Sequence, residues 1–215
     1  MKEFNHKNLK IINADCMDIM KEYKDNYFDL AIVDPPYGIK IQQSGGTPSH
    51  LGFKNYKKKN WDNKIPSKEY FTELFRVSKN QIIWGANYFV KYLNKGTMGW
   101  VFWFKGQNGL STSDGEIAYT SFQKAIRQVK INRCDIKLDG AIHPTQKPIR
   151  LYNFLLDNYS NKDDKILDTH LGSGSSAIAS FYYECKEFVG IEIDEDYYNS
   201  SIKRIKEKTK QIKLF

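Results

Sequence analysis

The sequence has few of the residues that build disulfide frameworks or metal sites. Its three cysteines, Cys16, Cys134 and Cys185, are scattered and form no Cys-x-x-Cys pair, and its four histidines show no metal-ligand spacing. No apolar run approaches the length of a transmembrane helix. The polar N-terminal residues lack the apolar core of a signal peptide. We therefore expect a cytoplasmic protein of a reducing compartment that binds neither a metal nor a membrane.

Basic residues are in excess over acidic ones. The 215 residues include 33 Lys and Arg against 25 Asp and Glu, which gives a net charge of +8. A chain of this length suits one domain, with or without an insert, and can bury a substantial core. The basic balance favours a polyanionic partner.

The strongest local motif follows an apolar run at residues 29–33, which we interpret as a buried strand. The run ends at Asp34-Pro35-Pro36-Tyr37, where the two prolines stop the strand and stiffen the backbone. An acid, two carbonyls and an aromatic ring are thus held at the carboxyl edge of a strand, where α/β sheets bind ligands. This arrangement suits a planar, amine-bearing substrate; the alternative is an ordinary turn.

Strand and helix signals alternate along the chain, which predicts an α/β fold. Strands are expected over residues 9–13, 29–33, 81–84, 99–104, 116–122, 165–168 and 188–193. Helices are expected over residues 16–23, 67–77, 149–159, 177–183 and 195–210. The strands at 99–104 and 116–122 should form an antiparallel pair at one sheet edge, and the last third of the chain should form a βαβ unit.

Two segments are basic and lack a regular apolar pattern. Residues 38–63 are interpreted as a long mobile loop, because loops of this length are usually functional or disordered. Lysines with interleaved aromatic rings suit a phosphate backbone and an unstacked base, although a solvated lysine loop is the alternative. Residues 123–142 are interpreted as a short target-recognition insert. The nucleic-acid-binding candidates are Lys54, Lys57, Lys58, Lys59 and Trp61 in the loop, and Lys124, Arg127, Lys130 and Arg133 in the insert.

A glycine turn follows the strand that ends at Asp168. Within Leu171-Gly172-Ser173-Gly174-Ser175 the two glycines allow a tight turn and close approach of a ligand. Glu192 lies about 20 residues further on, a spacing that suits a carboxylate binding ribose hydroxyls. The chain has no Gly-Lys-Ser/Thr sequence, which excludes a P-loop. The turn therefore predicts an adenosine-bearing cofactor and leaves its kind open.

Two further sites contribute polar groups. His143-Pro144-Thr145-Gln146-Lys147-Pro148 places a hydroxyl, an amide and an ammonium before a helix, where a carboxylate can bind, unless it is an ordinary proline-bounded loop. Asp15 ends the strand at 9–13 and is either a helix N-cap or a ligand-binding acid, and both roles can hold at once. The neighbouring Cys16 is interpreted as a small apolar residue.

Together these motifs resemble the amino-methylating DNA methyltransferases that use S-adenosylmethionine. The resemblance rests on Asp-Pro-Pro-Tyr at 34–37, the Leu-Gly-Ser-Gly-Ser turn at 171–175 and His-Pro-Thr-Gln-Lys-Pro at 143–148. The catalytic motif precedes the cofactor turn, as in the circularly permuted beta group. Trp103-Phe104-Lys105 and Glu116 also look like elements of that group. The match runs from about residue 13 to about residue 198.

The resemblance implies a Rossmann-like, seven-stranded, doubly wound sheet. It places the methionine part of the cofactor at Gly172–Gly174, the ribose at Glu192, the adenine at Asp15 and the amino-acid end near Lys147. The implied cofactor-binding set is Asp15, Cys16, Asp34, Thr145, Gln146, Lys147, Asp168, His170, Leu171, Gly172, Ser173, Gly174, Ser175 and Glu192. One departure concerns Asp168-Thr169-His170, since the family pattern has Asp-Pro-Phe there and His170 replaces an aromatic that faces the cofactor.

The expected reaction is methyl transfer to the exocyclic amine of a flipped adenine in double-stranded DNA, with Asp34, Pro35, Pro36 and Tyr37 as catalytic residues. Aspartate at position 34 favours adenine as a family habit, and cytosine or an RNA base is the alternative. A third interpretation is a non-catalytic nucleic-acid-binding subunit of the same fold. Dimerisation would extend the reach of so short an insert, and a restriction nuclease is a further candidate partner.

Overall fold

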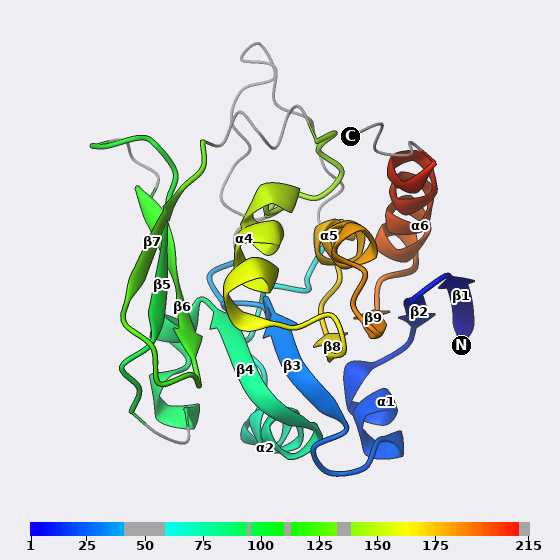
Figure 1. The fold of residues 1–215 in the computed structure, drawn as a ribbon, viewed down its shortest axis with the longest axis horizontal. Coiled ribbons are helices and arrows are strands. Elements are labelled where there is room, and N and C mark those ends of the chain that lie inside the picture. The colour runs from blue at the N-terminus through cyan, green and yellow to red at the C-terminus, as the bar shows by residue number, and fades with distance from the viewer. Residues whose placement is uncertain (41–58, 94–95, 110–112, 133–138, 211–215) are drawn as a thin grey trace.

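The computed structural model describes residues 1–40, 59–93, 96–109, 113–132 and 139–210 (Figure 1). Two predicted regions therefore lie partly outside the described residues, namely most of the loop at 38–63 and the centre of the insert at 123–142. Lys54, Lys57, Lys58 and Arg133 fall in these parts. In the described part of the chain, no helix is long and apolar enough to cross a membrane.

Nine strands of the described residues form one sheet in the order β1-β2-β9-β8-β3-β4-β6-β5-β7. The strands are β1 (Lys2–His6), β2 (Leu9–Asn13), β3 (Phe28–Val33), β4 (Ser78–Trp84), β5 (Trp100–Phe104), β6 (Gly115–Thr120), β7 (Arg127–Lys130), β8 (Lys165–Asp168) and β9 (Glu187–Glu192). The strands from β2 to β4 in this order are parallel. β6 is antiparallel to both β4 and β5.

Helices cover both faces of the sheet (Figure 1). On one face lie α4 (Ile149–Tyr159), α5 (Ser175–Tyr183) and α6 (Glu195–Thr209); on the other lie α1 (Cys16–Glu22) and α2 (Lys68–Val77). Successive residues of β3 alternate between the two cores, as a strand requires: Leu30 and Ile32 pack under α4 and α5, while Ala31 and Val33 pack under α1 and α2. The sheet is thus doubly wound, as predicted.

Local sequence explains where the helices begin. Asp15 caps α1, accepting a hydrogen bond from the Met17 backbone N–H at 2.8 Å, and Asp194 caps α6 in the same way through Tyr197 N–H at 3.0 Å. In α2 the spacing of Tyr70, Phe71, Leu74 and Val77 supplies the buried face.

The fold class is confirmed, and the sheet is wider than the seven strands expected. The inner seven strands, from β2 to β5 in sheet order, correspond to the predicted ones. β1 adds one edge strand; its residues carry mostly polar side chains and gave no strand signal. β7 adds the other edge, within the segment predicted as an insert, and it pairs in parallel with β5. The β5–β6 pair is therefore antiparallel as predicted, with β7 outside it.

Candidate active site

The end of β3 presents Asp34 beside the ends of β4 and β8, its neighbours in the sheet. Pro35 and Pro36 follow, and Tyr37 comes next, with Gly38 at a positive φ of 71°. A Cβ at Gly38 would lie 3.1 Å from the Ile65 backbone nitrogen, so this turn combines a left-handed backbone with a close approach. The catalytic motif predicted from the sequence is thereby held as a rigid loop at the sheet edge.

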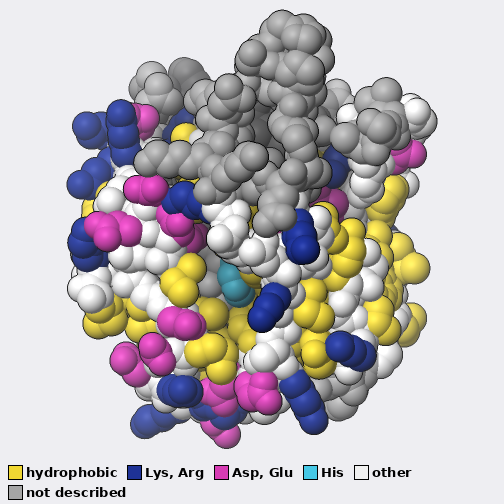
Figure 2. Space-filling view, turned by 180° about the vertical axis from the view of Figure 1, so that it is seen from behind, with side chains coloured by type: hydrophobic (Ala, Val, Ile, Leu, Met, Phe, Trp, Pro, Cys, Tyr) yellow, Lys and Arg dark blue, Asp and Glu magenta, His cyan; other side chains and the backbone are white. Residues whose placement is uncertain are grey.

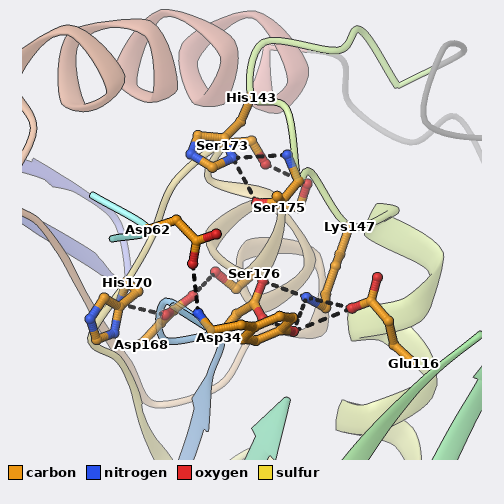
Figure 3. Close-up of polar contacts among 12 residues, drawn as sticks. Asp34, Asp62, Glu116, His143, Lys147, Asp168, His170, Ser173, Ser175 and Ser176 are labelled. Atoms are coloured by element: carbon orange, nitrogen blue, oxygen red, sulfur yellow. Dashed lines mark hydrogen bonds and ion pairs between the residues drawn. The ribbon is translucent and has the colours of Figure 1, made fainter. Parts of the chain in front are cut away.

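Lys147 and Glu116, from two other segments of the chain, lie beside Asp34 (Figure 3). Its carboxylate is ion-paired with the ammonium of Lys147 and accepts a hydrogen bond from the Tyr37 hydroxyl at 2.6 Å. The same ammonium lies 3.1 Å from Glu116, and the other oxygen of Glu116 lies 2.8 Å from the ammonium of Lys105. Two carboxylates and two ammoniums therefore form one network with balanced charge.

Burial and charge oppose each other in this network. Burial raises the pKa of Asp34 by more than the nearby Lys147 lowers it. Burial would also raise the pKa of Glu116, but Lys147 and Lys105 outweigh it and the pKa is lowered. For Lys147 the two carboxylates outweigh the burial and raise its pKa. Glu116 therefore stays ionised and keeps Lys147 charged, which leaves Asp34 as the acid that gains a proton most readily.

The Tyr37 ring is packed between other groups rather than free. It stacks on Tyr88 with ring centroids 5.0 Å apart and an interplanar angle of 15°. A Cβ at Gly85, which has a φ of 67°, would lie 2.1 Å from the Cε1 atom of this ring. Only glycine at position 85 permits the observed place of the ring. The predicted stacking of Tyr37 on a base stays a prediction.

A cavity of about 780 Å³ opens over this network. Its volume lies within the range of about 300–1,000 Å³ that is typical of ligand sites. Tyr88, which is 41% exposed, contributes an aromatic surface to the wall. The lining includes the predicted catalytic motif Asp34, Pro35, Pro36 and Tyr37, the charged residues Lys105, Glu116 and Lys147, and Thr145 and Gln146.

The predicted cofactor turn connects β8 to α5. Gly172 and Gly174 both have positive φ, at 53° and 75°. Glu192, at the end of β9, accepts hydrogen bonds from the Gly172 N–H at 2.7 Å and the Asp194 N–H at 2.9 Å, one on each oxygen. The buried Arg204 supports the turn from α6 by donating to the Ser173 carbonyl at 2.9 Å.

Asp168 and His170 lie beneath this turn. Asp168 accepts hydrogen bonds from the Ser176 hydroxyl at 2.5 Å and the His170 N–H at 3.0 Å, yet burial raises its pKa to about 7. Burial lowers the pKa of His170 to about 4, so its ring is neutral at physiological pH. The ring contacts Tyr70 edge-on at 5.4 Å and thus keeps an aromatic surface at this position.

These residues fit an adenosine-bearing cofactor. Burial raises the pKa of Glu192 to about 7. Each of its oxygens accepts one of these two backbone hydrogen bonds, and a carboxylate oxygen has two lone pairs, so both can also accept from ribose hydroxyls. β2 pairs with β9, and the Ala14 N–H donates to the Glu192 carbonyl at 3.3 Å, so Asp15 follows at the same sheet edge. The structure brings Asp15, Glu192 and the glycine turn to one region, and their roles in cofactor binding stay predictions.

The histidine-containing motif lies between the glycine turn and the charged network around Asp34. The His143 ring is 3.8 Å from the position that a Cβ of Gly172 would take, and its Nδ1 atom lies 3.1 Å from the Thr145 hydroxyl. Gln146 accepts from the Ile142 N–H at 3.0 Å. Lys147 is ion-paired with Asp34 and Glu116, and its predicted place near the amino-acid end of the cofactor stays a prediction.

Several of these contacts were not predicted as part of the site. The sequence motifs singled out Lys105 and Glu116 without giving them a role, and Asp62 was not singled out. The only local signal for Lys105 is that a charged residue follows the otherwise apolar strand β5. Glu116 gives a comparable signal, as a charged residue near the start of β6. In the part of the chain that the structure describes, no group of three His, Cys, Asp or Glu side chains could hold a metal ion.

The described nucleic-acid candidates have different surroundings. Lys59 pairs with Asp194 and Asp196, and Trp61 packs on His143 with centroids 5.2 Å apart. Lys124 donates to the Asn158 carbonyl at 2.6 Å. Arg127 and Lys130 are exposed on the edge strand β7. Figure 2 shows Lys and Arg side chains interspersed with Asp and Glu on the face opposite to that of Figure 1.

Comparisons with known proteins agree with this architecture. Residues 91–203 match the DNA methylase family N6_N4_Mtase. The type II methyltransferase M2.MboI of Moraxella bovis is 23% identical, over 98% of this chain and 92% of that protein. M.HpaI of Haemophilus parainfluenzae is 25% identical, over 91% and 74%.

Solved structures share the fold. The complex of M1.HpyAVI with SAM has a TM-score of 0.64 at 20% identity and covers 92% of this chain and 98% of its own. The cytosine-N4-specific PvuII DNA methyltransferase has a TM-score of 0.61 at 13% identity, with 96% and 92% covered. Because the family match spans more than half of the chain, the protein belongs to the N4/N6 DNA methylase family, whose methyl donor is S-adenosylmethionine.

Proposed function

We propose that the protein methylates the exocyclic amine of adenine in double-stranded DNA, at a specific sequence. The observation that carries this proposal is the position of Asp34 at a cavity of about 780 Å³, followed by two prolines and an aromatic ring. An acid and a carbonyl at adjacent positions can accept both N–H groups of an exocyclic amine. Asp34 rather than another residue type at this position favours adenine, as it does in the family that the sequence resembles.

The residues of this chain have distinct tasks in the proposed reaction. The carboxylate of Asp34 and the carbonyl of Pro35 accept hydrogen bonds from the amine, which favours a pyramidal nitrogen. Bound S-adenosylmethionine supplies an electrophilic methyl group. Positive charge that develops on the amine nitrogen is stabilised by Asp34. Because burial raises the pKa of Asp34, its carboxylate is also a suitable acceptor for the proton that the nitrogen loses.

The ion pair with Lys147 leaves Asp34 able to act in this way. Each carboxylate oxygen has two lone pairs, and the contacts with Lys147 and Tyr37 use one on each oxygen. Glu116 shares the charge of Lys147, so the ammonium does not fully cancel the charge of Asp34. The target base must leave the duplex to reach this cavity.

On the cofactor side, we propose that Glu192 binds the ribose and Asp15 the adenine, with the methionine part at the glycine turn Gly172–Gly174 and its amino-acid end near Lys147. The exposed Arg127 and Lys130 and the basic loop and insert are proposed to contact the DNA backbone. Sequence recognition would come from the same regions.

Cytosine is the second candidate target. A neighbour with this fold is described as cytosine-N4-specific, and the amine of cytosine presents the same two N–H groups. The two substrates need the same acceptor pair, so the fold does not separate them.

Modification mapping by long-read sequencing tests the proposal. DNA from cells that express the wild-type chain should carry N6-methyladenine in one short sequence, and DNA from cells that express Asp34→Ala should carry none. Absence of methylation with both proteins, together with no binding of S-adenosylmethionine in calorimetry, would instead favour a non-catalytic DNA-binding subunit.

A further inference from the structure

We infer that Asp62 is a positioning residue that fixes the catalytic loop, and that the segment from Lys59 to Asp62, here called the crosspiece, ties this loop to the cofactor turn. The inference rests on the proposed methyl transfer for its kinetic consequence. It concerns residues to which the motifs assign no catalytic or positioning role.

Asp62 holds the two backbone donors that follow the double proline. One of its carboxylate oxygens accepts from the Tyr37 N–H at 2.8 Å and the Gly38 N–H at 2.9 Å. Its backbone carbonyl accepts from the Lys40 N–H at 3.0 Å. Asp62 is only 3% exposed. Two successive N–H groups that share one anionic oxygen form a compact and strongly oriented contact.

The contact of Asp62 is important because it lies directly after the two prolines. Proline has no N–H group, so Pro35 and Pro36 cannot be held in place by hydrogen bonds that their own backbone donates. The first donors after Asp34 are therefore those of Tyr37 and Gly38, and both bind Asp62. The Tyr37 hydroxyl in turn donates a hydrogen bond to Asp34 at 2.6 Å. Asp62 thus sets the position of Tyr37, and Tyr37 orients the catalytic carboxylate.

Lys59, at the other end of the crosspiece, forms ion pairs near the predicted cofactor site. The ammonium of Lys59 lies 2.6 Å from one oxygen of Asp194 and 3.0 Å from Asp196. It also lies 4.5 Å from the centre of the Tyr197 ring. The Asp194 N–H donates to Glu192, the predicted ribose ligand, at 2.9 Å. Lys59 therefore anchors the crosspiece beside the residue expected to bind the ribose.

The middle of the crosspiece packs on the third motif. The Trp61 ring lies 5.2 Å from the His143 ring, and His143 contacts Tyr197 edge-on at 4.3 Å. These contacts and the chain itself thus form a continuous path from Glu192 to Asp34. The path runs through Asp194, Lys59, Asp62 and Tyr37. We expect the crosspiece to fix the position of the loop that carries Asp34 relative to the cofactor turn. Small misplacements of reacting groups cost much of the rate.

The test compares Asp62→Ala with Asp62→Asn, using Asp163→Ala as a control at an exposed acid. Asn keeps an oxygen that can accept both N–H groups, whereas Ala removes it. In hydrogen exchange measured by mass spectrometry, Asp62→Ala should speed exchange in the peptide that contains Tyr37 and Gly38 about tenfold or more. Asp62→Asn should restore most of the protection, and Asp163→Ala should match the wild type.

Kinetics then separates positioning from binding. In single turnover with saturating DNA and cofactor, Asp62→Ala should transfer the methyl group about 10- to 100-fold more slowly. Asp62→Asn should recover most of the rate. Wild-type exchange and wild-type transfer in Asp62→Ala would overturn the inference. Equal loss in Asp62→Ala and Asp62→Asn would also overturn it, because the acceptor oxygen would then not be the cause.

The coupling to the cofactor side has its own variant. Lys59→Met should speed exchange at Tyr37 and Gly38 to a smaller extent than Asp62→Ala, and unchanged exchange would overturn the coupling. Hydrogen exchange does not depend on the identity of the methylated base. A wild-type protein that methylates no DNA would therefore refute the proposed function while the exchange result still decides the positioning role.

Discussion

The ammonium of Lys147 is ion-paired with the carboxylate of Asp34 in a site where the Lys147 side chain is only 2% exposed. Glu116 shares this ammonium at 3.1 Å. Loss of the ammonium would leave two largely buried carboxylates close together, with Asp34 unpaired and Glu116 paired only with Lys105. An unpaired charge in such a place is far more costly than a broken surface pair.

Replacement of Lys147 by Met should therefore destabilise the fold by about 3–5 kcal/mol. Urea unfolding at neutral pH measures this change. Lys162→Met is the matched control, because its pair with Glu184 at 3.3 Å is exposed on both sides; it should change the stability by no more than about 0.5 kcal/mol. A Lys147→Met protein as stable as the control would mean that the network is not a buried charge cluster.

A methyl group at Gly85 should displace the catalytic tyrosine. Gly85→Ala would put a Cβ 2.1 Å from the Tyr37 ring, whereas Gly109, at nearly the same φ of 69°, has nothing within 4 Å of such an atom. Both variants carry the backbone strain, and only Gly85→Ala adds the clash. We expect methyl transfer to fall about 100-fold in Gly85→Ala and to change little in Gly109→Ala, as measured in single turnover. Similar rates in the two variants would contradict the described place of Tyr37.

Buried acids predict how stability varies with pH. Burial raises the pKa of Asp168 to about 7, while an aspartate in the unfolded chain has a pKa near 3.9. Between about pH 4 and pH 7 the folded protein binds a proton that the unfolded chain has lost, so the free energy of unfolding should decrease as pH rises through this window. Glu192, raised to about 7 by burial, acts in the same direction.

Asp168→Asn should therefore make the decline between pH 5 and pH 7.5 shallower in urea unfolding, since an amide does not titrate. The exposed Asp163→Asn serves as the reference and should keep the wild-type slope. If Asp168→Asn showed the wild-type slope as well, the raised pKa of Asp168 would be refuted.

Glu192→Ala tests the assignment of the ribose site. Hydrogen bonds to a charged group contribute about 1.5–3 kcal/mol each, so the affinity for S-adenosylmethionine should fall roughly 10- to 100-fold in calorimetry. Asp34→Ala should bind the cofactor nearly as well as the wild type, because Asp34 contacts Lys147 and Tyr37 rather than the turn. The reverse order of affinities would exchange the roles of the two acids.

Strand and helix signals predicted the inner sheet and the five α-helices named above in the described part of the chain, because apolar periodicity and caps such as Asp15 act locally. β1 was missed since its residues are mostly polar, and it is held by pairing with β2. Part of the predicted insert pairs with β5 as the edge strand β7, on which Arg127 and Lys130 are exposed; its role in target recognition stays a prediction. Such pairings depend on a partner far away in sequence or on a nearby sheet edge.

The same distinction applies to the site. The sequence singled out Asp34, Gly172 and Glu192 as site candidates because their motifs and spacings lie within short stretches of the chain. Lys147 was predicted near the cofactor, but its pairing with Glu116 and Asp34 depends on how β6 and the segment before α4 meet in space. Asp62 gave no local signal at all, because its partners lie 24 and 25 positions earlier in the chain.

The central claim is methyl transfer to adenine by Asp34, and nucleoside analysis by mass spectrometry tests it most directly. Double-stranded DNA is incubated with S-adenosylmethionine and the purified wild-type or Asp34→Ala protein, then digested to nucleosides. We predict N6-methyladenine with the wild type and none with Asp34→Ala. N4-methylcytosine in place of N6-methyladenine, or methylation that persists in Asp34→Ala, would contradict the claim.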